Sequence, residues 1–256
     1  DASPSGLKFK SNNIENLLSV ESRWQSWLDV EASMARSQSE LKMIPRKVGN
    51  KIAKNCNLKK LNLKNIYRDL KITGHKLVPL IWELSRVCDK DSKKYVHWGG
   101  TTQNIVSNGD ILILRKIHKI FLNDLSDLLK ILSKLSLKTK NDLMAGRTHG
   151  QHALPITFGY KVACWIDEIS RHIERIKESE PRVFKCIFGG AVGTSASFGK
   201  YGNKLQKKIS IKLGLISSRI PTRSHLDHFA EYNLKPINFY KKNDKSRIRI
   251  AKKGKE

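Results

Sequence analysis

Apolar side chains recur at steps of three and four residues over several long stretches of the chain, which is the spacing of one face of an α-helix. The first such stretch covers residues 20–45 and a second covers residues 77–87. The longest covers residues 105–140 and contains no glycine or proline after Gly109. At 1.5 Å per residue this helix is on the order of 50 Å long, which is typical of a rod in a helical bundle.

Two further helices are predicted in the second half of the chain. One begins after Pro155 and ends before Pro181, and the other extends from about Tyr201 to Leu213. Gly214 suits the left-handed conformation that ends many helices. No run of strand length alternates between apolar and polar residues, so the pattern predicts an all-α fold dominated by an elongated helical bundle.

The same pattern predicts four regions along the chain. They are a flexible arm at residues 1–16, an amino-terminal helical domain at 17–104, a partial central bundle domain at 105–232 and a basic tail at 233–256.

The formal net charge of +26 is the extreme value of the composition. A field of that sign attracts polyanions, so nucleic acid is one partner to consider. The lysines, however, are spread along helical faces, and no zinc finger or aromatic RNA-binding motif is present. Nucleic-acid binding is therefore not favoured, and the charge is compatible with an anionic small-molecule substrate without selecting one.

The cysteines and the hydropathy of the chain indicate the cellular compartment in which the protein is expected. The four cysteines form no CxxC pair and no short ligand cluster, which disfavours a disulfide framework or a zinc module and favours the reducing cytosol. No run of about 18 uncharged apolar residues is present, and the start of the chain lacks the apolar segment of a signal peptide. We expect a cytoplasmic protein that neither crosses a membrane nor holds a metal.

Three segments between the predicted helices mix glycines with hydroxyl, amide and imidazole groups. They are HWGGTTQN at residues 97–104, GRTHGQH at 146–152 and FGGAVGT at 188–194. Glycine lets a ligand approach the backbone, and the polar groups bind carboxylates or move protons. Each segment alone is weak support for a site: GGAVG, for example, lacks the Walker lysine and is typical of a tight packing turn.

In order, these segments resemble the signature regions of the fumarase/aspartase superfamily, in the branch of the adenylosuccinate lyases and 3-carboxymuconate cycloisomerases. YVHWGGTTQ at residues 95–103 is similar to their HWGATSQ or HxGxTS motif, and MAGRTHGQHALP at 144–155 is similar to AGRTHxQxALP. TGH at residues 73–75 falls where the branch carries a histidine, and SHLDHFAE at 224–231 resembles RDRxAE.

The resemblance implies an anti-elimination that releases fumarate, or the related closure of a lactone in the cycloisomerases. A base removes the proton beside a carboxylate, donors hold the resulting aci-carboxylate, and an acid protonates the leaving group. On this interpretation His149 is the acid or its immediate partner, and His75 supports it. The predicted substrate-binding residues are His97, Thr101, Thr102, Gln103, Thr148 and Gln151. No cofactor is implied.

Structural alternatives remain open for several of these residues. Thr101, Thr102 and Gln103 also suit the capping of the long helix that follows them, and a helix N-terminus is itself an anion site. The other helical or near-helical histidines are expected to be structural or solvated: they are His118, His152 and His172.

The chain departs from the family pattern in three ways. Asn104 stands where many members have aspartate, and Ser107-Asn108-Gly109 replaces the usual threonine-bearing turn. The serine loop GSSxMPxKxNP, which carries the base, has no match in this sequence, and the family likeness ends near Tyr232. We therefore expect a truncation or a change of reading frame near residue 232, with a genuinely divergent carboxyl end as the alternative, and a chain that is inactive alone.

The resemblance is strongest to adenylosuccinate lyase and implies β-elimination that releases fumarate from a succinyl-amine substrate. Two alternatives remain open: a 3-carboxymuconate cycloisomerase-like enzyme, and a noncatalytic remnant that acts as an interaction protein. The resemblance also implies a homotetramer in which three subunits build each active site.

Overall fold

The computed structural model describes residues 14–223, 227 and 231, which form two compact units. The first unit contains residues up to 117 together with those from 181 to 229 that are described. The second contains residues 118–180 and residue 231. This division differs from the domain boundary expected at residues 104/105, which stays a prediction.

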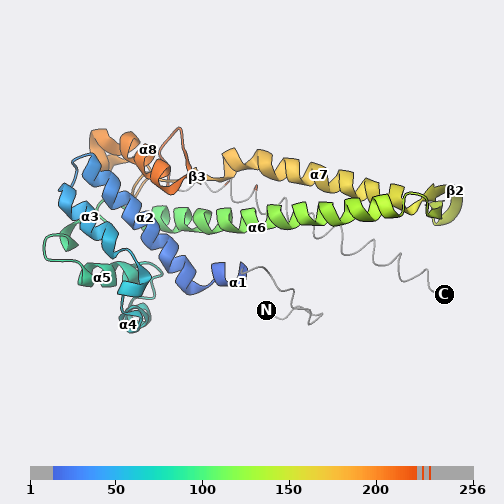
Figure 1. Ribbon diagram of the computed structural model, residues 1–256. Coiled ribbons are helices and arrows are strands. Elements are labelled where there is room, and N and C mark those ends of the chain that lie inside the picture. The colour runs from blue at the N-terminus through green and yellow to red at the C-terminus, as the bar shows by residue number, and fades with distance from the viewer. Residues whose placement is uncertain (1–13, 224–226, 228–230, 232–256) are drawn as a thin grey trace. The chain divides into compact units, whose positions relative to one another are not determined.

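The core of the first unit is built around α2 (Val20–Glu40) (Figure 1). Ser19 begins this helix by accepting a hydrogen bond from the Ser22 N–H at 3.1 Å. One face of α2 is fully buried, and α3 (Arg46–Asn55) packs across it. Gly49 allows that approach, because a Cβ there would lie 2.5 Å from the carbonyl oxygen of Ala35.

Other short elements complete this unit. The helices are α1 (Ile14–Leu17), α4 (Leu63–Thr73), α5 (Val78–Val87) and α8 (Gly202–Leu213), and the 3₁₀ turns are η1 (Leu58–Lys60), η2 (Lys93–Tyr95) and η3 (Ala196–Tyr201). A parallel pair joins β3 (Lys185–Cys186) to β4 (Ile216–Ser217). Gly214 ends α8 with a φ of 63°, as its position in the sequence predicted.

The second unit is a helical hairpin whose two helices are connected by a β-hairpin (Figure 1). Residues 118–138 of α6 (Thr102–Lys138) pack along α7 (Phe158–Val183). Leu125, Ile169 and Ile176 form the buried centre of this contact. The predicted long helix is therefore confirmed, and so is the mainly helical fold.

The prediction that no strand would occur is wrong. Residues 143–157, expected as a glycine-rich loop, form the antiparallel strands β1 (Leu143–Thr148) and β2 (Gln151–Thr157). Gly146 sits at a bulge, and a Cβ there would lie 2.7 Å from the Leu154 carbonyl oxygen. The bulge and Pro155 interrupt the alternation by which a strand is normally recognised.

Three helix predictions also need correction. α7 continues through Pro181 to Val183, because Val183 is fully buried and its packing offsets the lost backbone hydrogen bond. α3 and α4 were not predicted, because their apolar faces are short: α3 buries Val48, Gly49, Ile52 and Ala53, and α4 buries only Ile66 and Asp69. Residues 14–16 of the expected arm belong to α1, whereas residues 1–13 and the whole of the predicted tail at 233–256 lie outside the described residues.

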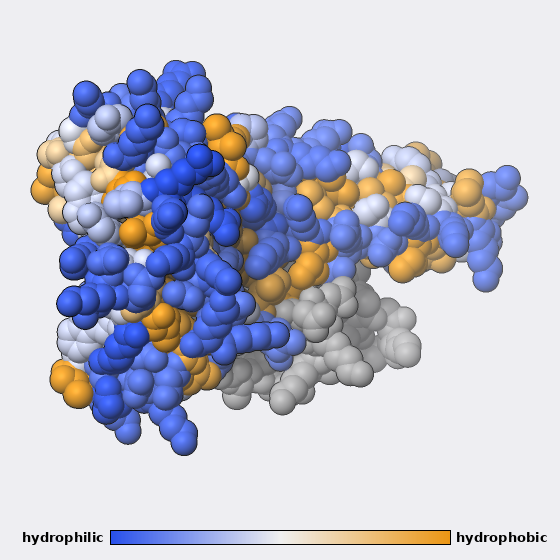
Figure 2. All heavy atoms as spheres, turned by 60° about the vertical axis from the view of Figure 1, so that its left-hand side comes forward, coloured by the Kyte–Doolittle hydropathy of each residue, from blue (hydrophilic) through white to orange (hydrophobic). Residues whose placement is uncertain are grey.

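The face drawn in Figure 2 is dominated by hydrophilic residues, with smaller hydrophobic patches between them. Within the described residues, no helix combines the length and the apolar character needed to cross a bilayer.

Candidate functional site

The first and third glycine-rich segments lie together in the first unit. Ser197 Oγ donates a hydrogen bond to the Gly99 carbonyl oxygen at 3.3 Å. A Cβ on Gly99 would lie 2.5 Å from Phe198 Cε1, and its φ of 70° also favours glycine. Phe198 stacks on Phe188 with ring centroids 5.5 Å apart. The loop that follows His97 is thereby held against residues 188–198.

Two buried asparagines at the start of α6 fasten the third segment. Asn104 Oδ1 accepts hydrogen bonds from the N–H groups of Gly189 and Gly190 at 3.3 and 2.9 Å. One turn later, Asn108 accepts from the Ile187 N–H at 3.0 Å and donates to the Ile187 carbonyl at 2.6 Å. Buried backbone groups need partners, so these bonds determine the path of residues 187–190.

These asparagines are the positions at which the sequence departs from the family pattern. An aspartate at position 104 would offer the same acceptor oxygen to the two glycines. The asparagine adds an Nδ2 group that has no hydrogen-bond partner within the part of the chain that the structure describes. Asparagine at position 104 therefore keeps the hydrogen bonds that hold Gly189 and Gly190, and its buried Nδ2 donor is left without a described partner.

His97, in the first segment, is paired with a buried carboxylate. Its Nδ1 lies 2.5 Å from Glu31 Oε1, and Glu31 is only 1% exposed. Burial lowers the pKa of His97, but the charge of Glu31 and the hydrogen bond outweigh burial and raise it overall. The backbone of His97 has a φ of 59°, which is uncommon outside glycine. The imidazole is thus oriented by its partner and favoured in its charged form.

Thr101, Thr102 and Gln103 lie where α6 begins. Thr102 is the first residue of the helix, and the Thr101 carbonyl accepts from the Ile105 N–H at 3.3 Å. Among the described residues, neither threonine hydroxyl has a hydrogen-bond partner, so the capping alternative is not observed. Gln103 Nε2 donates to Ser107 Oγ at 2.6 Å. Both hydroxyls remain available to a ligand beside a positive helix end.

His75 occupies a separate turn of the first unit, between α4 and α5. Its Nδ1 accepts hydrogen bonds from the N–H groups of Leu77 and Val78 at 3.2 and 3.1 Å. An acceptor nitrogen carries no proton, so in this arrangement the hydrogen of the ring is on Nε2. None of its hydrogen bonds reaches residues 97–104.

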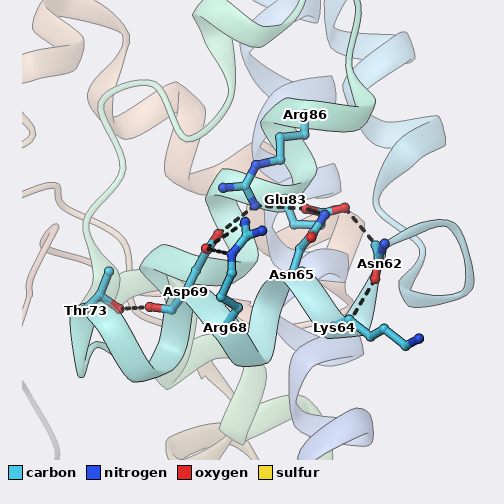
Figure 3. A network of polar contacts seen from close by, with 8 residues as sticks. All are labelled: Asn62, Lys64, Asn65, Arg68, Asp69, Thr73, Glu83 and Arg86. Carbon is cyan, nitrogen blue, oxygen red and sulfur yellow. Dashed lines mark hydrogen bonds and ion pairs between the residues drawn. The ribbon is translucent and has the colours of Figure 1, made fainter.

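A buried ionic network stabilises the two helices that flank His75 (Figure 3). Arg86 pairs with Asp69 Oδ2 at 2.6 Å and with Glu83 Oε2 at 3.0 Å, and Arg68 pairs with Asp69 Oδ1 at 3.0 Å. Burial raises the pKa of Asp69, but the hydrogen bonds from both arginines lower it overall. The Asp69 carbonyl accepts from Thr73 Oγ1 at 2.9 Å, and Thr73 Oγ1 accepts from the His75 N–H at 3.2 Å.

Thr148, His149 and Gln151 belong to the second unit, on the β-hairpin. Thr148 pairs with Gln151, so His149 and Gly150 are the two central residues of the turn. Their φ values are 48° and 79°. Two positive φ values are the geometry of a type I′ turn, which suits right-twisted strands. All these residues are exposed, and a two-residue X-Gly turn was the sequence signal that could have predicted the hairpin.

The other three histidines that the structure describes have different surroundings. His118 is 2% exposed and its Nε2 lies 2.8 Å from Glu180 Oε1, within the second unit. His152 is exposed on β2 and lies 3.2 Å from an Arg147 nitrogen. His172 lies 3.9 Å from Glu168, one turn before it on α7.

Glu31 was not among the residues predicted for the site. It stands four residues after Trp27 and four before Ala35, and both of these are buried. A carboxylate in the middle of a buried helical stripe is a signal for a specific partner, because an unpaired buried charge is costly. As for metal ligands, the part of the chain that the structure describes contains no group of three or more histidine, cysteine or acidic side chains suited to an ion.

Comparison with known proteins places this geometry in a family. A family model described as Lyase matches residues 13–232. The N-acetyl-S-(2-succino)cysteine lyase of Enterococcus italicus is 38% identical over 224 residues, which are 88% of this chain and 49% of that protein. The adenylosuccinate lyase of Methanocaldococcus jannaschii is 33% identical, over 90% of this chain and 50% of that protein.

A solved structure agrees with these relatives. The fumarate lyase of Mesorhizobium sp. BNC1 superimposes with a TM-score of 0.85 at 33% identity, covering 90% of this chain and 54% of that one. The chain spans about half the length of the curated relatives it matches. It belongs to the lyase family of the fumarase/aspartase superfamily and corresponds to the amino-terminal portion of its members.

Proposed function

We propose that this chain contributes the carboxylate-binding part and the general acid of a lyase that releases fumarate from a succinyl-amine substrate, as adenylosuccinate lyase does. The observation that carries the proposal is the loop of residues 97–102. There a histidine with a raised pKa precedes two threonine hydroxyls, unpaired among the described residues, at the start of a 37-residue helix. A cation, hydroxyl donors and a helix N-terminus together suit a dicarboxylate.

In this proposal His97, Thr101 and Thr102 bind a substrate carboxylate, and Gln103 lines the same site. Proton removal beside that carboxylate places negative charge on its oxygens. Donors that are already in position stabilise this charge without reorganisation. The support of residues 97–100 by Phe198 and Ser197 favours such preorganisation.

His149 acts in the proposal as the acid that protonates the leaving nitrogen, and Thr148 and Gln151 bind substrate beside it. The turn presents its imidazole at the tip of a hairpin, where a second surface can reach it. His75 supports the reaction as an Nε2–H donor, because its Nδ1 accepts two backbone hydrogen bonds.

The substrate has three candidates. The similarity to adenylosuccinate lyase favours a succinyl amine, whereas the similarity to a succinocysteine lyase favours a succinyl thioether. Lactone closure by a cycloisomerase-like enzyme is the third. All three share the dicarboxylate, so the leaving group is what discriminates between them.

We also propose that the protein forms a homotetramer in the cytoplasm. Large apolar side chains of the second unit are exposed. They include Ile131 at 63%, Leu137 at 71% and Leu143 at 79% exposed. Figure 2 shows hydrophobic patches on the helices of this unit. Exposed apolar patches mark association surfaces. Light scattering of the purified chain tests this, and a monomer at micromolar concentration contradicts it.

Ligand binding is the first test of the function, because the serine loop of the family has no match in this sequence. The purified chain is titrated with adenylosuccinate, N-acetyl-S-(2-succino)cysteine and 3-carboxymuconate, and the histidine resonances are followed by NMR. We expect saturable shifts with adenylosuccinate at lower concentration than with the other two. If none of the three ligands perturbs any histidine, the proposal fails.

Fumarate release by the same preparation is the second readout. Where it is detected, His149→Ala should lower it by about 100-fold, the contribution typical of a general acid. His152→Ala is the matched control, since it removes an imidazole from the same hairpin. Equal losses in the two variants would contradict the role of His149.

A further inference from the structure

We infer that Glu31 is a positioning residue for the predicted substrate-binding site: it holds His97 through Nδ1 and leaves Nε2 for a carboxylate of the substrate. The inference rests on the proposed function only in the identity of the ligand. The Glu31–His97 pairing stands on geometry within the first unit.

The position of Glu31 is costly for an ordinary structural residue. It is 1% exposed and lies on the face of α2 that also buries Trp27 and Leu28. Moving a carboxylate out of water costs several kcal/mol, on the order of what paired charges recover in good geometry. An apolar residue would fill the same place without that cost. A function beyond packing therefore explains a glutamate here better than stability does.

The partners of Glu31 are unusually few for a buried carboxylate. Oε1 lies 2.5 Å from His97 Nδ1, whereas Oε2 has no hydrogen-bond partner among the described residues. A fully satisfied structural carboxylate accepts several hydrogen bonds, as Glu83 does from Asn62, Asn65 and Arg86. The interaction of Glu31 is directed at a single imidazole.

The pairing determines which ring nitrogen is available. With Nδ1–H donated to Glu31, the second nitrogen is Nε2, and no described residue hydrogen-bonds to it. The His97 side chain is 22% exposed, while that of Glu31 is 1% exposed. A ligand can therefore reach His97 but not the carboxylate behind it. Below the raised pKa of His97, Nε2 carries a proton and donates to an anion.

The other groups near the pair do not replace Glu31. Among the described residues, Glu31 is the charged group that acts on His97. Burial, followed by the charge of Glu31, raises the pKa of the Cys56 thiol well above its usual range. The thiol therefore stays neutral near pH 7 and adds no charge beside the pair. Gln38, on the same helix, donates to the Trp98 carbonyl at 2.8 Å and holds the neighbouring backbone without a charge.

The decisive measurement is a histidine NMR titration of the full chain, with the His97 signal assigned by its loss in His97→Gln. In the unsubstituted chain we expect the His97 midpoint above the ordinary value of about 6.5. Glu31→Gln keeps the shape but removes the charge, and should lower that midpoint by about one pH unit. Glu180→Gln, the same change at the His118 pair, should leave the His97 midpoint unmoved.

Two outcomes overturn the inference. One is a His97 midpoint at or below 6.5 in the unsubstituted chain, a result that needs no variant to fold. The other is a folded Glu31→Gln chain whose His97 midpoint does not move. A separate titration with fumarate tests the ligand, and weaker binding by Glu31→Gln than by Glu180→Gln is expected. Absence of fumarate binding in every chain would count against the proposed function, while the pH midpoints would still decide the pairing.

Discussion

The two units treat their candidate site residues in different ways. In the first unit, His97 is paired with Glu31, which is 1% exposed. Residues 187–190 are held by hydrogen bonds to Asn104 and Asn108, both fully buried. In the second, Thr148, His149 and Gln151 stand on an exposed hairpin. Preorganisation requires supporting contacts, so the first unit holds its part of the site ready, whereas a catalytic His149 requires another surface to cover it.

A core substitution should separate the two regions most strongly. Leu28→Ala removes a side chain that is 0% exposed in the first unit, and should lower the free energy of unfolding by about 2–5 kcal/mol. Arg147→Ala, at an exposed position of the hairpin, should change it by less than about 0.5 kcal/mol. Urea denaturation followed by fluorescence measures both, and similar losses would remove the distinction between the regions.

The support of the glycine-rich loop is tested at Asn104. Asn104→Ala leaves the buried N–H groups of Gly189 and Gly190 without an acceptor, at a cost of about 1–3 kcal/mol in unfolding free energy. Asn123→Ala, the same change on the exposed face of α6, should cost less than about 0.5 kcal/mol. Thermal unfolding compares them. An Asn104→Ala chain as stable as Asn123→Ala would mean that the loop does not depend on this residue.

The hairpin should respond locally rather than globally. Gly150 has a φ of 79°, and Gly150→Val should destabilise the turn by about 1–2 kcal/mol, because a β-branched side chain disfavours that conformation. Amide exchange in residues 143–157 should accelerate while exchange in α2 stays unchanged. Gly150→Asn, which tolerates the left-handed region better, is the control, and equal acceleration in both variants would argue against the I′ turn.

The smallest effect is expected at an exposed ion pair of the first unit. A hydrogen bond from Lys51, then one from the Ser92 backbone, lowers the pKa of Asp89 to about 2. Because this pKa is depressed in the folded state, the interaction stabilises the fold above the unfolded value near 3.9 and is lost as pH falls toward 2. Lys51→Met should raise the Asp89 midpoint in a carboxylate NMR titration. An unchanged midpoint would contradict the pairing.

The family and most of the helices were predictable because their signals are local. The motifs at residues 95–103 and 144–155, with their order along the chain, were enough to identify the family. Helical periodicity placed α2, α5, α6 and α8 within a few residues of their observed bounds. The hairpin was missed because a bulge and a proline break its alternation, and Pro181 did not end α7 because burial of Val183 offsets its cost.

The chain's order of motifs, its apolar stripes and its turn glycines determined the family, the helices and the residue types of the candidate site. Only the tertiary structure decided which side chains form hydrogen bonds with one another. Glu31 meets His97 across 66 positions of sequence, and Asn108 meets Ile187 across 79. Contacts of that separation depend on how buried faces pack and on which polar groups then need partners, and no local spacing carries that information.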